Sequence, residues 1–280
     1  MSKISTNTIE KKHYSVPNLI RALKIFEFLS NHPESCTMTM IAEKLDFPKN
    51  SVFRILKTLT QQGYLVESGK SYQLSTKFLA LGHAALGDAN LSEKSIDIMR
   101  ELRDTVKETT ALGTINGAQG VVLEAVLGTY PVNFMIQVGH VFHLYTSGPG
   151  KAMLAFLPDE ERDRILEQIA FKRFTKRTIT SKKALLRELD GVREKGYAID
   201  RAEKVEGLHC VSAPVFNHRK YPIAAIWITG PVYRFPASDF DRLGKIVLEY
   251  AMRISGRFGF EPDIGNHSTY PGRPQIPPAR

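Results

Sequence analysis

The sequence predicts an α+β protein built from two parts, and three observations lead to this prediction. First, the chain has 280 residues, which is long for one typical core and suits two domains of ordinary size. Second, residues 16–75 read as three short helical patterns followed by a hairpin. Third, short strand-like runs alternate with helical patterns from Ala111 onward, which is typical of an α+β domain with an antiparallel sheet.

The smaller, N-terminal part contains the three helical patterns. The first follows Asn18, the expected N-cap, and Thr39 is the expected N-cap of a short second helix. The stretch "DFP" is expected to form the turn before the third helix, with Pro48 inside its first turn. Gly63 is expected to end this helix, and its inner apolar stripe consists of Val52, Ile55, Leu56 and Leu59.

A hairpin and two helices come next. Residues 64–66 and 72–74 are strand-like, Ser68-Gly69 between them has turn chemistry, and Lys70 stands at the expected tip. Helical patterns then cover residues 76–86 and 91–109. The first part therefore predicts the order helix, helix, helix, hairpin, and a long helix after it.

The larger part mixes both kinds of pattern. Its strand-like runs are "ALGTIN", "GVVLEAVL", "VNFMIQVG", "YAID", "LHCVSAPVF" and "YPIAAIWITG". Its helical runs are "GKAMLAFL", "DEERDRILEQIA", "SKKALLRELDGVREKG" and "SDFDRLGKIVLEYAMRISGRF". The last 16 residues carry four prolines and few apolar groups, so a disordered tail is expected.

Composition narrows the class of protein. The net charge is +9, and residues 1–80 hold 11 Lys and Arg against 6 Asp and Glu, so a positive field near the N-terminus favours polyanionic partners. No apolar run reaches the roughly 20 residues of a membrane span, and the first residues lack the apolar core of a secretory signal. Cys36 and Cys210 are too far apart in sequence for a zinc spacing. We therefore expect a cytoplasmic protein without a membrane, metal or other cofactor.

Helix order, turn and hairpin together predict a winged helix-turn-helix, in which the third helix enters the DNA major groove N-terminus first. The polar residues at its start lie off the apolar stripe, and helix N-termini attract phosphate. Asn50 and Arg54 carry donors suited to base edges, while Lys49, Ser51 and Lys57 suit phosphates. Lys70 on the wing is expected to contact the adjacent backbone. A solvated polar face on a small helical domain is the alternative, and the local charge and the wing argue against it.

The chain resembles the IclR family of bacterial transcriptional regulators over residues 15–258. The resemblance is carried, in this order, by "LIRALKIFEFL", "TMIAEKLDFPKNSVFRILKTLTQQGYL", "GKSYQLSTKFLALG", "SGPGKAMLAFLP", "KGYAIDRAEKVEGLHCVSAPV" and "ITGP". It implies a sequence-specific regulator of double-stranded operator DNA, acting as a homodimer or dimer of dimers, with a GAF-like C-terminal domain that binds a small-molecule effector. Leu79, Leu81, Ala84, Ala85 and Leu86 are expected to pair two chains.

The resemblance also implies the segments that contact the effector, which we expect to be a small organic acid. Asp200 would accept a hydrogen bond from the ligand, and backbone N–H groups near Gly150 would hold its carboxylate. Leu208, Cys210 and Ser212 share one strand face by their period of two. The implied effector-binding residues are Gly148, Pro149, Gly150, Asp200, Leu208, Cys210, Ser212, Trp227 and Thr229.

Three positions depart from the family pattern. Pro149 stands where Ala or Thr is usual and removes one N–H from the expected anion site. Trp227 stands where a small residue is often found, so it shrinks the cavity or offers a stacking face to a planar ligand. The stretch "DRAEK" replaces a common D-x-E-E-H, so Lys204 occupies the place of that histidine.

Other interpretations stay open at this point. In one of them, Gly148 and Gly150 form a turn without binding a ligand, and Cys210 and Trp227 are core residues without a ligand contact. An enzyme is the second hypothesis, with Ser147 or Cys210 as nucleophile and His143 or His209 as base, although no G-x-S-x-G motif supports it. His140 and His143 form an H-x-x-H pair whose members face opposite sides of a strand, and His209 is expected to be exposed. The third hypothesis is a scaffold protein or a protein that binds nucleic acid without regard to its sequence.

These patterns give five segments. Residues 1–15 are expected to form a flexible arm and residues 16–75 the winged helix-turn-helix domain. A linker helix covers residues 76–90, the GAF-like effector domain covers residues 91–260, and residues 261–280 form the disordered tail.

Overall fold

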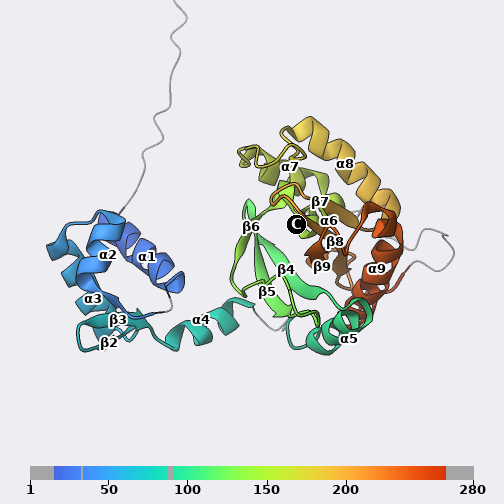
Figure 1. Cartoon of the computed structure of the whole chain (residues 1–280). Coiled ribbons are helices and arrows are strands. Elements are labelled where there is room, and N and C mark those ends of the chain that lie inside the picture. Colours follow the sequence, from blue (N-terminus) through green and yellow to red (C-terminus); the bar gives the residue numbers. More distant parts are fainter. Residues whose placement is uncertain (1–15, 33, 87–90, 263–280) are drawn as a thin grey trace, which may run out of the picture. The chain divides into compact units, whose positions relative to one another are not determined.

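The computed structural model describes residues 16–32, 34–86 and 91–262 (Figure 1). Contacts divide the chain into two compact units, Met1–Ala89 and Asn90–Arg280. The arm expected over residues 1–15 lies outside the described residues, as does the tail expected after residue 260, apart from its first two residues. The predicted α+β class, with helices and a wing in the first unit and an antiparallel sheet in the second, is confirmed.

Three helices form the first unit around one apolar core: α1 (Pro17–Ser30), α2 (Met38–Leu45) and α3 (Lys49–Gln61). Leu56 of α3 and Ile41 of α2 are fully buried, together with Ile25 of α1. The helix α3 ends as predicted before Gly63, which adopts a positive φ of 73° that glycine reaches without steric cost. The spacing of the apolar residues therefore identified the buried face of α2 and α3, whereas in α1 Leu19 and Leu23 of the apolar pattern are 57% and 51% exposed.

Two of the predicted helix caps are wrong. The helix α1 starts at Pro17, with Val16 as N-cap, and Asn18 Oδ1 instead accepts a hydrogen bond from Arg21 Nη1 at 3.1 Å. Proline suits the first helical position because its φ is already fixed and its missing N–H has no intrahelical partner. In α2 the cap is Thr37 and not Thr39, because Thr37 is extended and its Oγ1 accepts from the Met40 N–H at 3.3 Å.

The wing is a hairpin of β2 (Leu65–Ser68) and β3 (Ser71–Leu74), and β1 (Cys36–Thr37) pairs with the other edge of β3. All pairs are antiparallel, with Ser68 opposite Ser71. Gly69 and Lys70 form the turn, and Gly69 has a φ of 62°. Pro48 is the N-cap of α3, one residue before its predicted place inside the first turn. The helix α4 (Lys77–Leu86) follows the wing.

The second unit is built on a six-stranded antiparallel sheet with the strand order β6-β5-β4-β9-β8-β7. Its strands are β4 (Thr109–Asn116), β5 (Gln119–Val126), β6 (Val141–His143), β7 (Ala198–Arg201), β8 (Leu208–Phe216) and β9 (Pro222–Pro231). The register places Asp200 beside Cys210, and Cys210 beside Thr229, on three adjacent strands. One row of the sheet thus brings together three residues expected to bind the effector.

Helices cover both faces of this sheet (Figure 1). On one face, α5 (Ile96–Val106) and α9 (Phe240–Arg257) pack against alternate residues such as Val211 and Ile226. On the other face, the core cluster joins Ala198 and Ala225 to α6 (Gly148–Phe156), α7 (Asp159–Glu167) and α8 (Lys182–Lys195). Short 3₁₀ turns, η1 (Leu144–Thr146) and η2 (Ala237–Asp239), precede α6 and α9.

Two predicted elements of this unit are wrong. The helix expected over residues 91–109 is shorter: α5 ends at Val106, Lys107 turns the chain with a φ of 66°, and Thr109 already begins β4. The strand expected over residues 132–139 is absent, and that segment is an irregular loop with Met135 70% exposed. A run of apolar residues there predicts burial in a sheet, whereas the regular pairing with β5 begins only at Val141, after a backbone hydrogen bond from the Gly139 N–H to the Val122 carbonyl at 2.8 Å.

Candidate functional site

The exposed face of α3 is the candidate DNA-binding site of the first unit. Lys49, Asn50 and Arg54 are exposed, while the apolar stripe is buried at Val52, Ile55 and Leu56 and half-buried at Leu59. Pro48 is the N-cap of α3 and forms no side-chain hydrogen bond to the helix. The N-terminus of a helix carries backbone N–H groups without intrahelical partners and the positive end of the helix dipole. Lys70 is exposed at the wing turn. The predicted donors for base edges and phosphates therefore lie on the solvent side.

Two predicted phosphate contacts are already engaged within the unit. Lys57 Nζ forms an ion pair with Glu67 Oε2 of the wing at 2.8 Å, and the Tyr72 hydroxyl donates to the same carboxylate at 2.8 Å. The hydrogen bond from Lys57 lowers the pKa of Glu67. Ser51 is half-buried and its Oγ accepts from Arg21 Nη1 at 3.2 Å. Lys57 thus fixes the wing against α3, and its charge is shared with Glu67.

The sequence reasoning missed one residue on this face. Phe53 is 49% exposed although it lies in the middle of α3. It stands three residues after Asn50, so it lies beside Asn50 on the helix surface. An exposed phenyl ring can contact the methyl group of thymine in the major groove. Its place outside the apolar stripe was the signal available in the sequence.

A cavity of about 290 Å³ on the α6 face of the sheet is the candidate effector site. This volume is near the lower end of ligand pockets, about 300–1,000 Å³, and fits a metabolite-sized molecule. Six of the predicted effector residues line it: Pro149, Asp200, Leu208, Cys210, Trp227 and Thr229. Gly148, Gly150 and Ser212 are not among its lining residues.

The start of α6 is closed more tightly than the sequence predicted. Ser147 Oγ is the N-cap and accepts the Gly150 N–H at 3.2 Å, so that N–H is not free for a ligand carboxylate. Pro149 has no N–H. The Gly148 N–H is therefore the remaining donor in the first turn of α6 that has no partner inside the helix. Ser212 lies behind Gly148, since a Cβ added to Gly148 would come within 2.3 Å of Ser212 Oγ.

Asp200 and Cys210 occupy the buried wall of the cavity. Burial, and after it the nearby Glu203 carboxylate, raise the pKa of Asp200 to about 7. Burial also raises the pKa of the Cys210 thiol, which donates a hydrogen bond to Thr229 Oγ1 at 3.0 Å. Asp200 Oδ1 accepts the Glu203 N–H at 2.8 Å. The role predicted for Asp200, accepting a bond from the ligand, is therefore partly taken by the protein itself.

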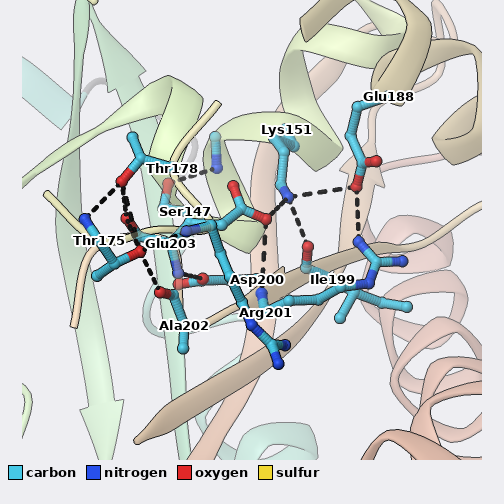
Figure 2. A network of polar contacts seen from close by, with 12 residues as sticks. Ser147, Lys151, Thr175, Thr178, Glu188, Ile199, Asp200, Arg201, Ala202 and Glu203 are labelled. Carbon is cyan, nitrogen blue, oxygen red and sulfur yellow. Dashed lines mark hydrogen bonds and ion pairs between the residues drawn. The ribbon is translucent and has the colours of Figure 1, made fainter. Parts of the chain in front are cut away.

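A buried ion pair fixes the loop that follows Asp200 (Figure 2). Lys151 is fully buried, and its Nζ lies 2.5 Å from Glu203 Oε1, 2.5 Å from the Ile199 carbonyl and 3.3 Å from Glu188 Oε1. The Thr178 hydroxyl donates to the Glu203 carbonyl at 2.7 Å. These contacts hold the β7 side of the turn between β7 and β8.

The imidazoles of His140 and His143 both line the cavity. The expectation that they face opposite sides of a strand is wrong, because His140 precedes β6 and only His143 belongs to it. Phe142 also lines the cavity, edge-on to Trp227 with ring centroids 5.7 Å apart. Lys204 is a further lining residue. The sequence marked these positions as a histidine pair and a family departure but did not connect them to a site.

The groups named for catalysis have structural contacts in this unit. Ser147 is committed to capping α6 and the Cys210 thiol is held protonated by its raised pKa. His209, expected to be exposed, is 6% exposed, and its Nδ1 lies 2.8 Å from the Phe235 carbonyl.

Among residues 16–32, 34–86 and 91–262, no helix is long and apolar enough to cross a bilayer.

Comparison with known proteins identifies the same two domains. Two family models match: the IclR helix-turn-helix domain over residues 19–69 and the bacterial transcriptional regulator IclR C-terminal domain over residues 83–256. The HTH-type transcriptional regulator KdgR of Escherichia coli K12 is 33% identical over 254 residues, covering 90% of this chain and 96% of KdgR. The transcriptional repressor IclR of the same organism is 27% identical over 248 residues, covering 87% and 90%.

A solved structure leads to the same assignment. The crystal structure of the Thermotoga maritima IclR superposes with a TM-score of 0.71 at 28% identity, covering 87% of this chain and 99% of that one. The family models, the relatives and the fold therefore agree over most of the chain. This protein belongs to the IclR family of bacterial transcriptional regulators, with an N-terminal helix-turn-helix domain that binds DNA and a C-terminal effector-binding domain.

Proposed function

We propose that this regulator reads its operator with the exposed start of α3 and that a small organic acid, bound in the cavity of the second unit, controls how tightly it holds DNA. The cavity is the observation that carries the proposal. It combines an apolar aromatic wall, Trp227 and Phe142, with a helix start and a few polar groups, which is the usual composition of a small-molecule site.

The DNA half of the proposal assigns roles on one helix face. Asn50 and Arg54 reach base edges, where bidentate contacts to adenine and guanine carry about 1–3 kcal/mol of discrimination each. Lys49 and Lys70 neutralise phosphates. Since Lys57 is paired with Glu67, it supports the wing and contributes less to phosphate binding than the sequence suggested.

Arg54→Ala tests this half. The variant is expected to lose about 1–3 kcal/mol of operator affinity and much of its preference over unrelated DNA, measured by fluorescence anisotropy at several salt concentrations. Lys183→Ala, which removes an exposed positive charge from α8 in the other unit, is the matched control and should bind like the native chain. Unchanged operator affinity in Arg54→Ala would overturn the assignment.

The effector half has a built-in reporter, because Trp227 is the single tryptophan of the chain and lines the cavity. Titrating small carboxylic acids is expected to change its fluorescence. An acid present at 100 times its dissociation constant should add about 2.7 kcal/mol of apparent stability. The same acid should shift operator affinity, since a ligand acts through its difference in affinity for two states. If acids that alter Trp227 fluorescence leave DNA binding unchanged, the coupling is wrong.

We further propose that the chain acts as a homodimer or a dimer of dimers. The support is α4, where Leu79 and Leu81 are 66% and 45% exposed. Two-fold symmetric regulators bind half-sites about 34 Å apart, which a single recognition helix cannot span.

A further inference from the structure

Positive groups gather around one aromatic ring at the cavity. Lys204 Nζ lies 3.3 Å from the centroid of the Phe174 ring, and Lys172 Nζ lies 5.9 Å from it. The His143 ring stacks on the same phenyl ring with centroids 5.1 Å apart. Lys204 and His143 line the cavity, so this cluster of His143, Lys172 and Lys204 belongs to its wall and rim.

The charge of the cluster is not balanced by acids. Within residues 91–262, neither Lys172 nor Lys204 forms an ion pair with an acidic side chain. Burial and the neighbouring Lys172 lower the pKa of Lys204, and burial with both lysines lowers that of His143. Burial is the larger cause of both shifts and the neighbouring lysine charge adds to it, so an anion placed among these groups would relieve the repulsion.

The position of Lys204 is set by the protein. It directly follows Glu203, whose side chain is tied to buried Lys151 and whose carbonyl accepts from Thr178 (Figure 2). The backbone at this point is therefore ordered before any ligand arrives, which reduces the entropy lost on binding. Where the family pattern has a histidine, this chain places a longer and more basic side chain on a fixed turn.

The rest of the cavity leaves room for one more polar end. Trp227, Phe142 and Cys210 give it an apolar middle, and Ser147 with the start of α6 provides a separate polar region. Asp200 also lines the wall, but with a pKa of about 7 it is neutral in a large share of molecules at neutral pH. An acid with one carboxylate would satisfy one polar region and leave the other without a partner.

We propose that the effector is a small acid with two anionic groups, and that Lys204, aided by His143 and Lys172, binds the second group at the rim of the cavity. This inference rests on the proposed effector function of the same cavity. Lys204 is then a specificity residue of this particular chain, because it selects dianionic ligands over otherwise identical monoanions.

Matched pairs of probes test the proposal through Trp227 fluorescence of the full chain. The pairs are glutarate against monomethyl glutarate, isophthalate against monomethyl isophthalate, and 3-phosphoglycerate against glycerate, which separate two carboxylates from a phosphate with a carboxylate. In the pair that binds best, the dianion is expected to bind at least tenfold more tightly. Lys204→Gln should reduce this preference to less than threefold while the monoanion keeps its affinity, and Lys204→Arg should preserve it.

Lys183→Gln is the control for a lost surface charge and should behave like the native chain. Equal binding of dianion and monoanion by the native chain, or an unchanged preference in Lys204→Gln, would overturn the second subsite and leave the cavity as an effector site. Failure of every probe, monoanionic or dianionic, to change Trp227 fluorescence would contradict the proposed effector function, and the inference would fall with it.

Discussion

Lys151 is a cation without access to water, and its partners make that arrangement stable. Removing a charge from water costs several kcal/mol in a real protein. The Glu203 carboxylate, the Ile199 carbonyl and Glu188 compensate this cost at distances of 2.5, 2.5 and 3.3 Å. As a result, the turn that follows Asp200 and carries Lys204 is held beside α6. The Glu203 carboxylate also depends on Lys151, because Glu203 Oε2 is buried without a hydrogen-bond partner among the described residues.

Lys151→Met should therefore be strongly destabilising. Breaking a buried ion pair by removing one partner leaves an uncompensated charge and typically costs about 3–5 kcal/mol. Urea unfolding followed by Trp227 fluorescence reports the free energy of unfolding of this unit. Lys183→Met, at an exposed position of α8, should change it little, and adding Glu203→Gln to Lys151→Met should recover part of the loss. A cost below 1 kcal/mol would mean that Lys151 does not hold the turn.

Asp200 predicts a particular pH dependence. Its pKa rises from 3.8 to about 7 on folding, so between these values the folded protein keeps a proton that the unfolded chain has released. Its favourable contribution is complete below about pH 4 and is lost as the pH rises through about 7. Asp200→Asn keeps an oxygen for the Glu203 N–H but cannot ionise. Its stability relative to the native chain should rise between pH 5 and pH 8, by up to about 3 kcal/mol.

The measurement is the free energy of unfolding of both proteins at the two pH values, again from Trp227 fluorescence in urea. The paired difference cancels the titration of other groups that both proteins share. A difference that stays constant, or falls, between pH 5 and pH 8 would show that Asp200 is ionised throughout in the folded protein.

At the scale of elements, the start of α6 depends on glycine for space. A Cβ on Gly150 would lie 2.3 Å from the Leu144 carbonyl oxygen and 2.4 Å from its Cα, whereas a Cβ on Gly148 would meet mainly Ser212 Oγ. Backbone cannot move aside as a hydroxyl can. Gly150→Ala should therefore cost more than Gly148→Ala, for which overpacking predicts about 1–3 kcal/mol.

A third glycine provides the control. Gly191 lies within α8 with nothing near its missing Cβ, so Gly191→Ala should stabilise by about 0.5–1 kcal/mol through helix propensity. Thermal unfolding of the three variants ranks them. If Gly150→Ala unfolds no earlier than Gly148→Ala, the close approach of η1 to α6 is wrong.

The sequence predicted elements well where they are packed against partners. The strand β8, which is buried on both faces, and the amphipathic helix α8 match their predicted runs almost residue for residue. Residues 132–139 predict a strand because they are apolar, yet they form an irregular loop that joins β5 through the Gly139 N–H at its end, and Met135 is exposed. Apolar content reports burial only when a partner exists, and pairing between distant strands is not written in the local pattern.

The candidate site was predicted in part for the same reason. The family resemblance implied Cys210, Trp227 and Thr229 as effector contacts, and all three line the cavity. Lys204 and His143 were not assigned to it, because their meeting at Phe174 joins three segments far apart in the chain. The ion pair of Lys57 with Glu67 is likewise a contact between helix and wing that spacing alone could not give.

At the scale of the whole molecule, the two proposed activities must be linked by a change in the state of the regulator. An effector alters operator affinity only if it binds two arrangements of the protein unequally, and a tenfold effect needs about 1.4 kcal/mol of difference. A symmetric dimer offers such arrangements, since the separation of two recognition helices decides whether both reach their half-sites. The exposed leucines of α4 are the surface through which we expect two chains to associate.

Leu79→Glu combined with Leu81→Glu should place charges in that contact and shift the protein toward monomers. The reason is that Leu79 and Leu81 are 66% and 45% exposed in the single chain, and burying them against a second copy contributes roughly 1.5–3 kcal/mol each. Light scattering measures the mass, and operator affinity should fall at least tenfold because one half-site binds alone. The Trp227 response to acids should persist, since the cavity lies within one chain. Leu127→Glu, at a leucine 49% exposed in the effector unit, is the control, and equal dissociation in that variant would place the dimer contact elsewhere.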